Sequence, residues 1–79
     1  MSQRFLLYSR SGCHLCDVML QDLEALTAGR DIVIERVDVD SSETLRARYG
    51  EHVPVLVAEG QEICRYRLDS RRVEAWLAD

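Results

Sequence analysis

The sequence predicts an α/β fold with the element order β-α-β-α-β-β-α, in which a four-stranded mixed sheet is flanked by three helices. Two observations lead to this fold class. In the first half, strand-like runs at residues 5–8 and 31–40 enclose a helical pattern, and the strands of such a βαβ unit must be parallel. In the second half, two strand-like runs are joined by the short segment EGQE, which indicates an antiparallel hairpin.

The first strand and the first helix are marked by their apolar patterns. The unbroken run FLLY at residues 5–8 suits a strand buried on both faces. A polar turn follows at residues 9–12, and Gly29 is a suitable C-terminal stop for the helix. Between them, apolar residues recur at spacings of four, four and three and should form one buried stripe: Leu15, Met19, Leu23 and Leu26.

The segment DIVIERVDVD at residues 31–40 is rich in β-branched residues and predicts the second strand. Polar side chains occur on both of its faces, so we expect it nearer the edge of the sheet than the first strand. A short helix should follow, and Glu43 stands in capping-box spacing from the first of its three candidate N-caps, which are Asp40, Ser41 and Ser42. This helix should pack Leu45 and Tyr49 on one face and stop at Gly50.

The second half of the chain predicts a hairpin and a final helix. Pro54 opens the strand PVLVA, because the first residue of a strand need not donate to the ladder. The strand ICRYRL at residues 63–68 alternates, with Cys64, Tyr66 and Leu68 on one side. Asp69 or Ser70 should cap the last helix, whose apolar face is formed by Val73, Trp76 and Leu77.

Length and composition narrow the class of protein. The 79 residues predict one domain over residues 1–79, and 47% hydrophobic residues suffice for a compact core. A formal net charge of -4 argues against non-specific nucleic-acid binding. No apolar run approaches the ~20 residues that cross a bilayer, and the N-terminal apolar stretch is too short for a signal peptide. We therefore expect a cytoplasmic protein that binds neither nucleic acid nor membranes.

The cysteines carry the functional signal. Three is an odd number, which disfavours a secreted domain stapled by disulfides, and in a reducing cytosol the close pair Cys13 and Cys16 is more often catalytic or metal-binding. Cys13 falls at the start of the predicted helix, where unpaired N–H groups and the helix dipole favour a thiolate. Arg10 adds a positive charge nearby. Cysteines in such places have pKa values of roughly 3.5–7.5, so we expect Cys13 to attack and the shielded Cys16 to resolve.

These motifs resemble those of a known family. The segment YSRSGCHLC between a strand and a helix, followed by HVPVLV and a hairpin, is similar to glutaredoxin, the smallest version of the thioredoxin fold, and the likeness covers nearly all 79 residues. The resemblance implies that Arg10 is the basic residue found three positions before the first cysteine, and Arg10 is our first candidate for contact with the substrate or glutathione. It also implies a cis peptide bond at Val53-Pro54, with the Val53 backbone facing Cys13 and able to pair with a substrate or glutathione backbone.

The chain departs from the glutaredoxin pattern in places. Between the cysteines it has His14-Leu15 instead of Pro-Tyr, and His14 is either solvated or, when protonated, a further stabiliser of the thiolate. In place of a Gly-Gly pair that glutathione approaches, the segment CRYRLD has Arg65 and Tyr66, whose side chains could obstruct glutathione or hold it differently. Asp69 matches the acidic residue that binds the glutathione amino group in the family.

The predicted function is thiol–disulfide exchange through Cys13 and Cys16. The expected partner is a disulfide-containing protein or a glutathione mixed disulfide, with glutathione or a thioredoxin-reductase-like enzyme as the reductant. We expect a monomer with no obligatory cofactor and no metal, and with glutathione as a candidate co-substrate.

Other functions stay open at this point. A structural zinc site would need ligands from Cys64, His14 and His52, which form no second close pair. A non-catalytic module could bind an iron–sulfur cluster between subunits, or a protein partner. An arsenate reductase would normally be longer and act through one cysteine. Cys64 itself is expected to be a small buried hydrophobe.

Overall fold

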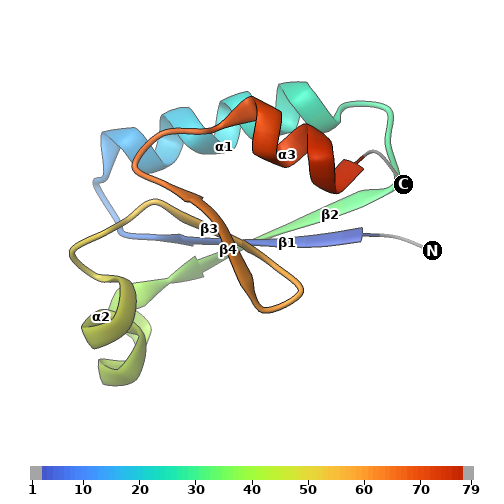
Figure 1. Ribbon diagram of the computed structural model, residues 1–79. Coiled ribbons are helices and arrows are strands. Elements are labelled where there is room, and N and C mark those ends of the chain that lie inside the picture. The colour runs from blue at the N-terminus through green and yellow to red at the C-terminus, as the bar shows by residue number, and fades with distance from the viewer. Residues whose placement is uncertain (1–2, 78–79) are drawn as a thin grey trace.

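The structure is a computed structural model that describes residues 3–77. A central sheet has α1 and α3 on one side and α2 on the other (Figure 1). The predicted order of strands and helices is confirmed, with a 3-10 turn added at Val39–Ser41. The elements are β1 (Gln3–Ser9), α1 (His14–Thr27), β2 (Ile32–Asp38), α2 (Glu43–Tyr49), β3 (Val55–Ala58), β4 (Gln61–Arg65) and α3 (Ser70–Leu77).

The sheet is mixed, as the sequence predicts. Its strands lie in the order β2-β1-β3-β4. β1 pairs in parallel with β2, whereas β3 runs antiparallel to both β1 and β4. β2 is an edge strand, which agrees with the polar side chains on both of its faces. The turn between β3 and β4 places Glu59 and Gly60 at positive φ (52° and 77°), the backbone pattern of a tight two-residue hairpin.

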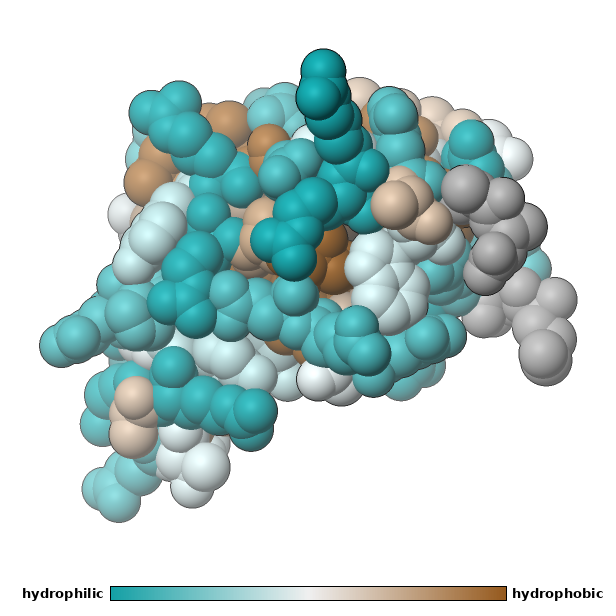
Figure 2. Space-filling model, in the orientation of Figure 1, coloured by the Kyte–Doolittle hydropathy of each residue, from teal (hydrophilic) through white to brown (hydrophobic). Residues whose placement is uncertain are grey.

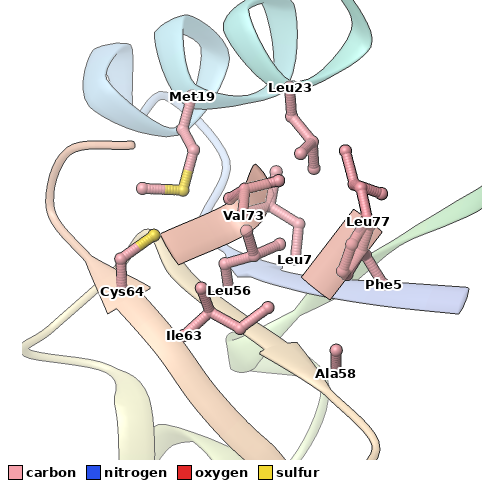
Figure 3. Close-up of a cluster of buried hydrophobic side chains, with 10 residues drawn as sticks. All are labelled: Phe5, Leu7, Met19, Leu23, Leu56, Ala58, Ile63, Cys64, Val73 and Leu77. Atoms are coloured by element: carbon pink, nitrogen blue, oxygen red, sulfur yellow. The ribbon is translucent and has the colours of Figure 1, made fainter. Parts of the chain in front are cut away.

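The main core lies between the sheet and the two helices α1 and α3 (Figure 3). β1 directs Phe5 and Leu7 toward the helices, and both side chains are fully buried. Burying a side chain of this size contributes about 1.5–3 kcal/mol. The other members of the cluster come from both helices and from the hairpin: Met19, Leu23, Leu56, Ala58, Ile63, Cys64, Val73 and Leu77.

On the opposite side of the sheet, α2 lies near one end of the strands and makes few contacts with them (Figure 1). None of the residues of α2 is fully buried. The Tyr49 ring stacks on Tyr8 of β1, with centroids 4.2 Å apart and planes at 21°. Ser42 caps the helix by accepting the Leu45 N–H at 3.3 Å. The aromatic stack thus joins α2 to the sheet, and the cap stabilises the start of the helix.

The buried stripe of α1 differs from the predicted one. Leu15 is 41% exposed, although the apolar spacing placed it in the core. The buried positions are Cys16, Met19, Leu23 and Thr27. At about 100° per residue these four share an arc of about 80°, and Leu15 lies beyond its edge. Cys16 is therefore part of the buried stripe, in which the sequence analysis did not include it.

The segment between β2 and α2 also departs from prediction. The strand ends at Asp38, two residues before the predicted end, because the Asp38 carboxylate accepts the Asp40 N–H at 2.9 Å and starts the 3-10 turn. The N-cap of α2 is Ser42, so the capping box expected between Asp40 and Glu43 is not formed. The Asp40 carboxylate binds two arginines instead.

β4 is earlier and shorter than predicted, and it contains a bulge. Leu56 pairs with Cys64 but Val57 pairs with Glu62, which leaves Ile63 as an extra residue. Ile63 and Cys64 are consequently both buried, so the predicted alternation of sides fails there. The strand ends at Arg65 because the next residue turns away at positive φ.

Candidate functional site

Three loops meet at one edge of the sheet. β1 ends at Ser9, and the antiparallel pairing of Tyr8 with Val55 places the start of β3 beside that end. Val55 also pairs with Arg65, so the end of β4 lies at the same edge. The segments 10–13, 50–54 and 66–69 therefore gather beside the N-terminus of α1 (Figure 1). The predicted site residues Arg10, Cys13, Val53, Pro54 and Asp69 lie in these segments.

Cys13 is the N-cap of α1. Gly12, at φ 76°, makes the left-handed turn that glycine adopts at no steric cost. The Cys13 sulfur then accepts the Cys16 N–H at 3.2 Å, in the place where an N-cap oxygen usually accepts. This hydrogen bond and the dipole of the 14-residue helix both favour negative charge on the Cys13 sulfur.

Cys13 and Cys16 form a disulfide, with their Cα atoms 5.3 Å apart. That separation lies within the usual range of about 4.4–6.8 Å, so the backbone needs no rearrangement to close or open the bond. Cys16 is fully buried in the stripe of α1, whereas Cys13 is partly exposed. Another molecule can therefore reach the Cys13 sulfur more easily than that of Cys16.

Arg10 is held by a carboxylate that the sequence did not reveal as its partner. Its Nε and Nη2 donate to the Asp40 carboxylate at 2.9 and 3.2 Å, and Arg46 donates to the same group at 3.3 Å. The hydrogen bond from Arg10 is the main reason that the pKa of Asp40 is lowered. Gly50 leaves room for both arginines, since a Cβ there would lie 2.5 Å from the Arg46 carbonyl oxygen and 3.0 Å from Arg10 Nη2. Arg10 and Asp40 thus form an ion pair, in which the carboxylate offsets the positive charge of Arg10.

A polar hollow lies beside Cys13, and its two arginines are both paired. Arg36 donates to Ser9 Oγ at 3.0 Å and to the Asp17 carboxylate at 2.9 Å, while Arg10 binds Asp40. No excess positive charge is therefore left there for an anion. The hollow is lined by Ser9, Arg10, Ser11, Gly12, Arg36 and Asp38.

The segment before β3 forms the second wall of this edge. The Val53-Pro54 peptide bond is cis, Val53 is partly exposed and Pro54 is buried. Tyr66 crosses this segment: its N–H donates to the Pro54 carbonyl at 2.8 Å, and its hydroxyl lies 2.8 Å from His52 Nδ1. The His52–Tyr66 pair joins residues 14 positions apart, and no local sequence signal pointed to it.

Asp69 and Cys64 connect the hairpin to α3. The Asp69 carboxylate accepts the Arg72 N–H at 3.2 Å, which confirms that Asp69 acts as a helix cap. Cys64 is a buried member of the core, as the sequence predicted. Burial raises the pKa of the Cys64 thiol, and a hydrogen bond with the Asp69 backbone opposes this shift in part.

Exposed apolar side chains flank the cysteine pair. Leu15, between the two cysteines, is 41% exposed, and Val18 lies one turn further along α1 at 38%. Tyr66 is 44% exposed on the other side of the edge. Apolar surface is visible over the N-terminal part of α1, amid a largely hydrophilic face (Figure 2). His14 is exposed at the first position of α1.

Two kinds of feature are absent from the part of the chain that the structure describes. Within residues 3–77, no group of three or more His, Cys, Asp and Glu side chains is placed to hold a metal ion. Over the same range, no helix combines the length and the apolar character that crossing a membrane requires.

Comparison with known proteins gives the family. The model of the Glutaredoxin-like domain (DUF836) matches residues 4–78. The chain belongs to this family. An uncharacterized protein of Mycobacterium tuberculosis is 32% identical over 77 residues, covering 91% of this chain and 79% of that protein.

Solved structures agree with this assignment. Protein Ne2328 of Nitrosomonas europaea is 37% identical, with a TM-score of 0.85 over 94% of this chain and 89% of that one. Thioredoxin 1 of Thermosipho africanus matches with a TM-score of 0.62 at 21% identity, covering 95% of this chain and 94% of that one, which shows a common fold. The fold class predicted from the sequence, a thioredoxin/glutaredoxin-like sheet with three helices, is therefore confirmed. A redox-type module with a Cys-x-x-Cys pair is the function that this family and fold support.

Proposed function

We propose that this glutaredoxin-like protein is a thiol–disulfide oxidoreductase that reduces protein disulfides or mixed disulfides through Cys13 and Cys16. One observation carries the proposal. Cys13 stands at the N-cap of α1 with its sulfur on the Cys16 N–H, while the partner sulfur one turn on is buried within bonding reach. The environment thus favours one accessible thiolate and one shielded thiol.

The exchange runs in two steps. The Cys13 thiolate attacks one sulfur of the substrate disulfide, forming a mixed disulfide and releasing the other substrate sulfur as a thiolate. Cys16 then loses its proton and attacks the Cys13 sulfur, which releases the second substrate thiolate and closes the Cys13–Cys16 disulfide. Two electrons pass from the dithiol to the substrate. An external reductant, glutathione or a thioredoxin-reductase-like enzyme, restores the dithiol.

The neighbouring residues take supporting roles in this proposal. The Val53 backbone, beside the cis bond to Pro54, would pair with the backbone next to the substrate sulfur. Arg10, fixed on Asp40, would orient the loop that carries Cys13, and a protonated His14 would add to the stabilisation of the thiolate. Asp69, already the cap of α3, would contact the amino group of glutathione if glutathione is a co-substrate.

Single cysteine substitutions test the proposal. With insulin as the disulfide substrate, we expect Cys13→Ser to lower the rate to the uncatalysed background. Cys16→Ser should stop turnover and accumulate a mixed disulfide at Cys13, visible by mass spectrometry, because nothing resolves it. Cys64→Ser is the matched control and should keep the activity, since Cys64 lies in the core. A Cys13→Ser protein that still reduces insulin would contradict the proposal.

The reduction potential separates the two candidate reductants. Equilibration of the Cys13–Cys16 pair in glutathione buffers, read by thiol alkylation, gives its value. A potential near the roughly -270 mV of thioredoxin would favour a reductase enzyme, and one near about -200 to -230 mV would favour glutathione.

A further inference from the structure

Tyr66 is held in a backbone conformation that a bulky residue rarely adopts. Its φ of 69° lies in the left-handed region, which costs free energy for any residue with a Cβ. Such residues persist where the surroundings fix them, and they gather at active sites and ligand clamps. Here the strain falls beside the Val53-Pro54 segment, because the Tyr66 N–H binds the Pro54 carbonyl at 2.8 Å.

Tyr66 is held by hydrogen bonds at its backbone and at its hydroxyl group. The backbone is tied to Pro54, and the hydroxyl lies 2.8 Å from His52 Nδ1, with the two rings edge to face at 6.1 Å between centroids. The side chain therefore lies along residues 52–54, yet it remains 44% exposed. A ligand that needs this space must break the hydrogen bond to His52 and move the ring.

The exposed surface of Tyr66 favours contact with apolar groups. A tyrosine with a restrained ring offers a large apolar contact at low cost in conformational entropy. Leu15, 41% exposed between the two cysteines, offers a second apolar contact at the same edge. Apolar side chains next to a protein cysteine can use both contacts. The arms of glutathione end in two carboxylates and one ammonium group, and the carboxylates gain nothing from an aromatic face and lose water on approaching it.

We propose that Tyr66 is a specificity-determining residue of the dithiol site, which favours protein disulfides and disfavours glutathione disulfide. This inference rests on the function proposed above. The expected substrate is a polypeptide with apolar residues beside its cysteine. A protein, and not glutathione, is therefore the better partner of Cys13.

The test compares three disulfides on Cys13 in a Cys16→Ser background, where each exchange stops at the mixed disulfide. The probes are insulin, glutathione disulfide and the small neutral bis(2-hydroxyethyl) disulfide, which serves as the reference. Relative to that reference, Tyr66→Gly should raise the rate with glutathione disulfide roughly tenfold, because both the ring and its hydrogen bond to His52 are removed. It should lower the rate with insulin several-fold, because the apolar contact is gone. Glycine suits the left-handed backbone at this position.

Two further variants separate specificity from backbone strain. Tyr66→Phe keeps the ring but loses the tether, so it should retain the insulin rate and gain only part of the glutathione rate. Glu59→Gly also replaces a residue at positive φ, at the far hairpin, and should leave all three rates unchanged. The proposal is overturned if Tyr66→Gly leaves both relative rates within twofold, or moves them in the same direction.

A titration with S-methylglutathione, which cannot exchange, gives a second readout. Tyr66→Gly should tighten its binding roughly tenfold if the ring blocks the tripeptide. An unchanged dissociation constant would count against Tyr66 as the barrier. If Cys13 reacts with none of the three disulfides, the proposed oxidoreductase function fails, and the titration still decides the role of Tyr66.

Discussion

The three cysteines lie in three different environments. Cys13 caps a helix and is partly exposed, Cys16 is buried one turn on, and Cys64 is in the core between the hairpin and α3. Local sequence was enough to predict the first two, because the helix start and the spacing of three are local features. The burial of Cys64 was expected from the general preference of free cysteine for the interior.

Because burial raises the pKa of Cys64, stability should depend on pH in the alkaline range. The folded state keeps the proton to higher pH than the unfolded state does. The contribution of Cys64 is therefore complete below the ordinary thiol pKa of 9.0 and is lost as pH rises through the folded value. We expect the unfolding free energy of the oxidised protein to fall above pH 9, and Cys64→Ala to reduce that fall.

Urea titrations between pH 7 and 10 would measure this effect. The oxidised protein is required because the Cys13–Cys16 disulfide removes the other two thiols from the titration. Tyr8, whose pKa burial also raises, is common to both proteins and cancels in the comparison. Parallel pH profiles for wild type and Cys64→Ala would contradict the assignment.

At the scale of elements, α2 is the most loosely attached helix. It has seven residues and buries none of them fully, and its contact with the sheet includes the Tyr8–Tyr49 stack. Arg46 in its last turn also binds Asp40, which in turn binds Arg10. Exposed ion pairs of this kind contribute little, typically below about 1 kcal/mol. Local opening of α2 should therefore precede global unfolding.

The aromatic stack gives a direct prediction for α2. Tyr49→Ala should speed hydrogen exchange of the α2 amides by about tenfold, since an aromatic pair contributes about 0.5–1.5 kcal/mol beyond its buried area. Tyr49→Phe keeps the stacked ring and should exchange at nearly the wild-type rate. Exchange followed by mass spectrometry or NMR measures the effect. Equal acceleration in α1 would mean that α2 does not open on its own.

Elements also show where sequence patterns fail. In α1, apolar spacing alone placed Leu15 in the core, but the sheet contacts the side of the helix that carries Cys16. In β4, alternation was broken by a bulge whose extra residue is Ile63. Both errors arise from tertiary contacts that a single helix or strand does not encode.

At the scale of the whole molecule, topology assembles the candidate site. The antiparallel register of β1, β3 and β4 brings three loops to one edge, although Cys13 and Tyr66 are far apart in the chain. The arrangement of the edge followed from the resemblance to glutaredoxin and not from periodicity. The long-range pairs Arg10–Asp40 and His52–Tyr66 had no signal in the sequence, because a pairing between distant charged or polar residues leaves no local pattern.

The single main core makes the molecule sensitive to changes on one side of α1. At the usual stability per residue, 79 residues give roughly 4–12 kcal/mol in total. Leu23→Ala removes a fully buried side chain and should cost about 2–5 kcal/mol, which lowers the melting temperature by roughly 10–30 °C.

Leu15→Ala is the matched control on the same helix, since it makes the same chemical change at a position that is 41% exposed. It should change stability by no more than about 0.5 kcal/mol. Calorimetry of the two variants measures both values under one condition. The apolar spacing of the sequence places the two leucines in the same buried stripe. A large loss of stability for Leu15→Ala would therefore support the predicted stripe, in which Leu15 is buried. A large loss for Leu23→Ala alone would place the core where the sheet contacts α1.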